Sequence, residues 1–162
     1  MKIWTISKDF DVAIANKVFN QNLFKDKTQL KEKCKNLHGH NITVTYELTA
    51  SGLQNDMVLD YTLLSPKVFH MFDVVHAEDL DHKLIISEYD PDYENLVKAL
   101  NGEMFVVDFT PTAETMAEYL CNEFYKFLKK QDLVNIDHIF EIAVSFNETK
   151  NSLCKVKMFM ED

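Results

Sequence analysis

The strongest constraint on the fold is a strict alternation of apolar and polar residues between positions 42 and 49. Ile42, Val44, Tyr46 and Leu48 alternate with Thr and Glu residues. Successive side chains of a strand point to opposite faces, so this pattern predicts a strand with one buried face. Residues 4–14, 140–146 and 156–160 repeat the pattern less strictly. The chain is therefore predicted to build a sheet with one apolar face.

Two helices are predicted between the first and the second pair of strands. Ser65 and Pro66 favour the start of the first helix, because Ser caps a helix and Pro fits its first turn. Apolar residues then recur at helical spacing as far as Val75. The second helix is expected to begin after Thr112 as its N-cap, with an apolar face that continues to Leu128.

The expected order of elements favours the α+β class. Residues 84–86 and 104–107 read as short strands, which we expect to form an extra hairpin between the two helices. Strand pairs before and after the helices predict an antiparallel ββααββ sheet with both helices on one face. At 162 residues the chain is expected to form one domain over 1–162.

Composition excludes several classes of protein. A net charge of −9 argues against a nucleic-acid partner, and three glycines leave no room for a Gly-rich phosphate loop. No apolar run has the length of a signal peptide or membrane span. Three cysteines lack a disulfide spacing, so a cytoplasmic protein with reduced thiols and no membrane partner is expected.

Polar residues continue the apolar faces of three predicted strands. His38 and His40 have the parity of Ile42, Asn16 continues the face of the first strand, and Glu148 continues the face of the 140–146 strand. A pocket at these strand ends would be partly desolvated. Metal ligands and ligand-anchoring carboxylates work in such surroundings.

The Cys34-x3-His38-x-His40 cluster is the densest motif. Two histidines at this spacing on a strand offer two nitrogens to one Zn²⁺. Three further interpretations stay open. The histidines could be partly exposed side chains near a turn at Gly39, Cys34 could be a third zinc ligand, or Cys34 could be a reactive thiol whose pKa the metal lowers.

Asp81-His82 is a second candidate motif, because a carboxylate beside an imidazole orients the ring and raises its basicity. A surface Asp-His pair is the alternative. His70, His76 and His138 are interpreted as structural or solvated side chains.

Five motifs in order resemble the 6-pyruvoyltetrahydropterin synthase and 6-carboxytetrahydropterin synthase family. Together with Lys8-Asp9-Phe10 they cover most of the chain. The motifs are Cys34 before His38-Gly39-His40, Asp56-Met57-Val58-Leu59-Asp60-Tyr61, Leu80-Asp81-His82, Pro111-Thr112-Ala113-Glu114, and Glu148-Thr149. The resemblance implies the tunnelling fold, in which subunits close into a barrel. It also implies a homo-oligomer, a tetramer or hexamer, with active sites between subunits.

The resemblance implies a lyase reaction on 7,8-dihydroneopterin triphosphate. Zinc would hold the side-chain hydroxyls and acidify the adjacent carbon. Cys34 would move the proton, and Asp81 with His82 from a neighbouring subunit would act as a second relay. Release of triphosphate and acetaldehyde would leave 6-carboxy-5,6,7,8-tetrahydropterin, on the way to queuosine. The pyruvoyl product of the family's other branch is the alternative.

The resemblance also implies how the substrate is bound. Glu148 would accept two N–H bonds from the guanidine-like edge of the pterin. Thr112 and Glu114 would line the pterin pocket.

One departure from the family concerns the metal. The family's first zinc ligand is a His in the first strand, and Asn16 takes that position here. An amide oxygen is a poorer zinc ligand than imidazole, so His38, His40 and Asn16 would form a weak or incomplete zinc site. A metal-poor relative that binds a pterin or purine without turnover is therefore an alternative. Another is a structural zinc protein that uses Cys34, His38 and His40.

Overall fold

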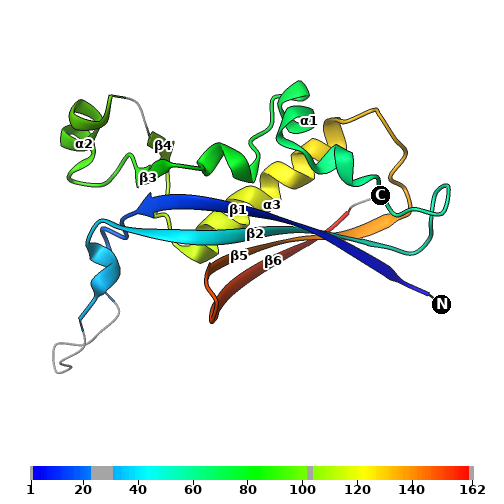
Figure 1. Cartoon of the computed structure of the whole chain (residues 1–162), viewed down its shortest axis with the longest axis horizontal. Coiled ribbons are helices and arrows are strands. Elements are labelled where there is room, and N and C mark those ends of the chain that lie inside the picture. The colour runs from blue at the N-terminus through cyan, green and yellow to red at the C-terminus, as the bar shows by residue number, and fades with distance from the viewer. Residues whose placement is uncertain (1, 23–30, 102–103, 161–162) are drawn as a thin grey trace.

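A six-stranded mixed sheet forms the frame of the molecule, with strands in the order β4-β3-β1-β2-β5-β6 (Figure 1). The structure is a computed structural model that describes residues 2–22, 31–101 and 104–160. The strands are β1 (Trp4–Asn16), β2 (His38–Ala50), β3 (Lys83–Ser87), β4 (Met104–Val107), β5 (Ile139–Thr149) and β6 (Ser152–Phe159). The helices are α1 (Pro66–Met71), α2 (Tyr93–Leu100) and α3 (Ala113–Lys130), with short 3₁₀ turns at Lys33–Lys35, Tyr61–Leu64 and Ala77–Leu80.

The alternating strands lie where the sequence predicts them. β1 and β2 pair antiparallel without a break from Trp4↔Ala50 to Asn16↔His38. Val44, Tyr46 and Leu48 are completely buried, which confirms the predicted apolar face. α3 packs along β5 and β6 and covers this face together with α1 (Figure 1). The architecture is of the α+β class, as predicted.

The predicted hairpin between the helices is wrong. β4 runs parallel to β3, and β3 runs parallel to β1, so the sheet is mixed rather than antiparallel. Parallel neighbours need a crossover connection, and α2 supplies it within the residues between Ser87 and Met104. The sequence analysis missed α2 and interpreted its surroundings as a hairpin loop.

The first helix is shorter than predicted. α1 ends at Met71, and Asp73 adopts a left-handed backbone conformation with φ of 54°. This turn redirects the chain so that Val74 reaches the core at 3% exposure. Pro66 occupies the first turn as predicted, but the Ser65 side chain makes no capping hydrogen bond.

The start of α3 carries a reciprocal cap. Thr112 Oγ1 accepts a hydrogen bond from the Thr115 N–H at 3.3 Å, and Thr115 Oγ1 accepts one from the Thr112 N–H at 3.0 Å. We expect Thr112→Ala to lower the free energy of unfolding by about 1 kcal/mol, because it leaves a first-turn N–H unpaired. Urea denaturation measures the change. Thr112→Ser keeps the hydroxyl and should lose much less; equal losses in both variants would contradict the capping role.

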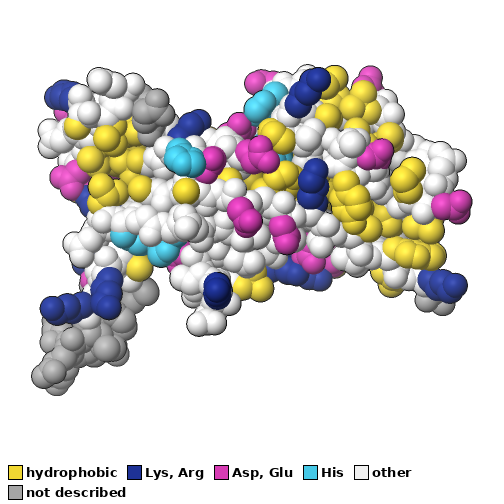
Figure 2. Space-filling model, in the orientation of Figure 1, with side chains coloured by type: hydrophobic (Ala, Val, Ile, Leu, Met, Phe, Trp, Pro, Cys, Tyr) yellow, Lys and Arg dark blue, Asp and Glu magenta, His cyan; other side chains and the backbone are white. Residues whose placement is uncertain are grey.

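In the described part of the chain, none of the helices combines the length and the apolar composition that crossing a bilayer requires. Figure 2 shows acidic side chains scattered over the face it presents and apolar side chains gathered toward both ends of the molecule. The scattered acids agree with the net charge of −9.

Candidate active site at the strand ends

The adjacent ends of two strands, β2 and β5, bring His38, His40 and Glu148 together. β2 begins at His38, and β5 reaches the same edge because Thr43 pairs with Asn147. A register shift on β5 between Asn147 and Thr149 lies at Glu148. One ligand atom from each of the three side chains lies within 4.8 Å of the others. The sequence analysis placed both histidines here correctly.

Three polar atoms at this edge are buried without a hydrogen-bond partner within the described residues: His38 Nε2, His40 Nε2 and Asn16 Oδ1. His38 Nδ1 lies 2.7 Å from the Asn36 carbonyl oxygen, to which it donates, so Nε2 carries the free lone pair. Asn16 Nδ2 donates to the Pro111 carbonyl at 3.1 Å, which leaves Oδ1 as an acceptor. Each unpaired buried acceptor costs about 1–3 kcal/mol. A bound cation would satisfy these acceptors, so the donor set fits zinc.

A cavity of about 660 Å³ opens beside this group, within the size range of small-molecule sites. Cys34, Thr112, Glu114 and Glu148, all predicted site residues, are among its walls. Glu148 belongs both to the cavity and to the group with the histidines. The Val18 N–H donates to the Cys34 carbonyl at 2.8 Å and fixes the segment that carries the thiol.

Asp81 and His82 form a pair that is fastened to β1 rather than to this cavity. The Ala13 N–H donates to Asp81 Oδ1 at 2.8 Å, and the His82 N–H donates to the Ala13 carbonyl at 2.7 Å. The Ala13 bond, and after it the His82 side chain, lower the pKa of Asp81. His82 Nδ1 lies 2.8 Å from Asp81 Oδ2.

His82 is exposed and conformationally strained. Its side chain is 82% exposed, and its φ of 57° is uncommon for a residue other than glycine. Neither Asp81 nor His82 lines the cavity of their own chain. Their assignment to a neighbouring subunit's site stays a prediction.

The sequence analysis did not foresee two features of the site. Glu148 was assigned to the substrate, but it also stands beside the histidines. Cys154 had no assigned role, yet it lines the same cavity as Cys34, because β6 returns beside β5. Burial, and then the charge of Glu114, raise the pKa of the Cys154 thiol. The shared parity of Cys154 with Val156 and Met158 was the available signal.

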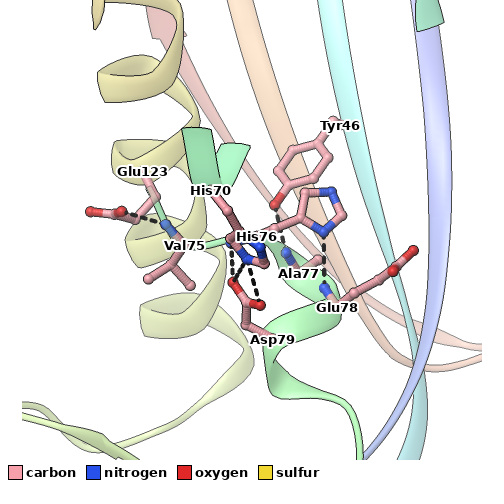
Figure 3. A network of polar contacts seen from close by, with 8 residues as sticks. All are labelled: Tyr46, His70, Val75, His76, Ala77, Glu78, Asp79 and Glu123. Carbon is pink, nitrogen blue, oxygen red and sulfur yellow. Dashed lines mark hydrogen bonds and ion pairs between the residues drawn. The ribbon is translucent and has the colours of Figure 1, made fainter. Parts of the chain in front are cut away.

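The remaining histidines lie outside the lining of the cavity and have polar partners of their own. His76 is fully buried, and its Nδ1 accepts a hydrogen bond from the Glu78 N–H at 3.1 Å (Figure 3). His70 Nε2 lies 2.8 Å from Asp79 Oδ1, and His138 Nε2 lies 2.8 Å from the Val58 carbonyl oxygen.

Comparisons with known proteins identify the family of the chain. The family model described as 6-pyruvoyl tetrahydropterin synthase matches residues 5–158. A 6-carboxy-5,6,7,8-tetrahydropterin synthase of Aquifex aeolicus is 35% identical over 141 residues, which cover 79% of this chain and 80% of the relative. The Haemophilus influenzae protein of the same name is 29% identical over 130 residues, covering 76% and 83% of the two chains.

Solved structures share the fold. An uncharacterized protein from Wolinella succinogenes superposes with a TM-score of 0.72 at 24% identity and covers 96% of this chain and 98% of its own. The 6-pyruvoyl tetrahydropterin synthase of Plasmodium vivax superposes with a TM-score of 0.65 at 16% identity, covering 99% and 100% of the two chains. The match over residues 5–158 shows that the chain belongs to the 6-pyruvoyl tetrahydropterin synthase family of enzymes.

Proposed function

We propose that the protein is a zinc-assisted lyase that converts 7,8-dihydroneopterin triphosphate to 6-carboxy-5,6,7,8-tetrahydropterin, an intermediate on the way to queuosine. Water is taken up, and triphosphate and acetaldehyde leave. The observation that carries the proposal is a cavity lined by Cys34 and Glu148. Glu148 also lies beside His38 and His40, whose Nε2 atoms have no hydrogen-bond partner within the described residues. The names of the Aquifex aeolicus and Haemophilus influenzae relatives support the carboxy product.

The residues of the chain divide the work of the reaction. Zinc, when bound at the strand ends, supplies Lewis-acid chemistry that acidifies the carbon beside the substrate's side-chain hydroxyls. Cys34, as thiolate on the cavity wall, takes the proton from that carbon. Asp81 and His82 from a neighbouring copy return a proton, and Asp81 orients the imidazole for this through a contact of 2.8 Å.

The cavity walls carry groups that can hold a pterin. The heterocycle presents a planar, guanidine-like N–H edge, which a carboxylate accepts in two parallel hydrogen bonds. Two carboxylates, those of Glu114 and Glu148, line the cavity, and Thr112 lies beside them at the start of α3. Either carboxylate has the chemistry to hold the heterocycle.

Copies of the chain would assemble as a tetramer or hexamer through their sheet edges. β4 and β6 are the outer strands of the described sheet, and their outer edges present unpaired backbone groups. Leu153 and Phe159 on β6 are 62% and 67% exposed. Contact with a second copy would remove these apolar side chains from water. Such an assembly would bring the exposed Asp81-His82 pair of one copy to another copy's cavity.

The test is incubation of the purified protein with 7,8-dihydroneopterin triphosphate across a range of added zinc. We expect stoichiometric release of triphosphate and acetaldehyde. Triphosphate release without acetaldehyde would instead identify the pyruvoyl reaction. No triphosphate release at any zinc concentration would overturn the proposal.

Asn16 favours a second candidate, a pterin or purine binder without turnover, because one expected imidazole ligand is replaced by an amide. Calorimetry with neopterin separates the two candidates. Tight binding without triphosphate release from the substrate would support the second.

A further inference from the structure

We propose that Glu148 is a metal ligand in this chain. Its carboxylate joins His38 Nε2 and His40 Nε2 in place of the imidazole that Asn16 lacks, with the Asn16 amide oxygen alongside. Glu114 is then the carboxylate left for the N–H edge of the pterin. The inference deepens the proposed function, on which it rests for the identity of the metal and the substrate.

The distance between His40 and Glu148 is that of two ligands sharing an ion. Bonds of about 2.0–2.1 Å at tetrahedral angles place neighbouring ligand atoms about 3.3 Å apart. His40 Nε2 and Glu148 Oε1 are 3.4 Å apart. Hydrogen bonds of this type are shorter, at about 2.7–3.2 Å, and His40 Nε2 makes none within the described residues. The two atoms form an ion pair when His40 is protonated, and a cation shared by both would hold them at a similar separation.

Asn16 supplies the independent observation. It lies directly opposite His38 in the β1–β2 register, so the two side chains share a face of the sheet. Asn16 is 4% exposed, and its Oδ1 is without a hydrogen-bond partner in the described structure. Its Nδ2 is held by the Pro111 carbonyl. A buried oxygen acceptor beside two unpaired imidazole nitrogens indicates a cation.

The charge balance explains why a carboxylate fits this position. An amide oxygen binds zinc more weakly than the imidazole it replaces. A carboxylate adds a negative charge that neither imidazole nor amide brings, and two histidines with one Glu are an established zinc set. Glu148 is only partly exposed, so solvent screens its attraction to the ion less than at the open surface.

Zinc titration of chelator-stripped protein by calorimetry, without substrate, tests the inference. We expect the unaltered protein to bind one zinc ion per chain. Glu148→Gln should lose at least about 100-fold in zinc affinity, because mutation of residues that only hydrogen-bond to metal ligands already lowers metal affinity by about 10–100-fold. Glu114→Gln is the matched control on the same cavity wall and should bind zinc unchanged. Asn16→His in the Glu148→Gln background should restore affinity, because it supplies a third imidazole.

Unchanged zinc affinity in Glu148→Gln would overturn the inference and return Glu148 to the pterin. If that variant does not fold, zinc-edge X-ray absorption of the unaltered protein decides. Two imidazoles with oxygen ligands are expected, and a third imidazole or a sulfur ligand would overturn the inference. Failure of the proposed function would look different, with intact zinc binding and no release of triphosphate.

Discussion

Cys34→Ala is expected to lower kcat for triphosphate release by about 10²–10⁴-fold, the contribution of a positioned general base. The thiol lies on the wall of the cavity, and the Val18 N–H holds its backbone carbonyl at 2.8 Å. A cation at the neighbouring histidines would stabilise the negative charge of a reactive thiolate at Cys34. Removal of the sulfur removes the base but none of the proposed metal ligands, so zinc binding should stay unchanged.

Cys154→Ala is the matched control for this prediction. Cys154 lines the same cavity, but burial raises the pKa of its thiol, so it is protonated at neutral pH. We expect this variant to keep the rate of the unaltered protein. Steady-state kinetics on zinc-loaded protein measure both variants. Equal losses would mean that the cavity tolerates no change of volume, and an active Cys34→Ala would exclude Cys34 as the base.

The sequence predicts best those features that depend on neighbours along the chain. The alternation at 42–49 and the cap at Thr112 are local patterns, and both are found in the structure. The direction of β3 and β4 depends on which distant strand each one meets, and no local pattern near residues 84–107 encodes it. A hairpin and a parallel crossover both start with two short apolar runs around polar turns.

The site likewise has features that one strand determines and features that depend on how strands pair. Strand parity placed His38, His40 and Asn16 at one edge, because parity is a property of each strand alone. The distance between Glu148 and His40 depends on the register shift between Asn147 and Thr149, which is a property of the paired strands. Strand parity also placed Glu148 at a strand end, and the family pattern gave it a role toward the pterin. The three-dimensional arrangement adds its close approach to His40.

His76 is expected to make the protein less stable in mild acid. Its ring packs against Phe10, Tyr46 and Phe69, and this burial lowers its pKa from 6.5 to about 4. Below pH 6.5 the imidazole takes up a proton in the unfolded chain but not in the folded one. The unfolded state then binds more protons, so the free energy of unfolding falls as the pH drops from about 6.5 to 4. The shift corresponds to about 3 kcal/mol.

His76→Asn isolates this contribution, because the asparagine side chain keeps an acceptor for the Glu78 N–H but does not titrate. Carboxylates such as Asp81, whose pKa is lowered, also destabilise the folded state in acid, so the difference between the two proteins is the informative quantity. Urea denaturation from pH 7 to 4.5 in the presence of a chelator measures it. We expect the loss of stability on acidification to be smaller in His76→Asn than in the unaltered protein. If the free energy of unfolding fell equally with pH in His76→Asn and in the unaltered protein, the prediction would be wrong. That result would mean that burial of the His76 ring does not lower its pKa.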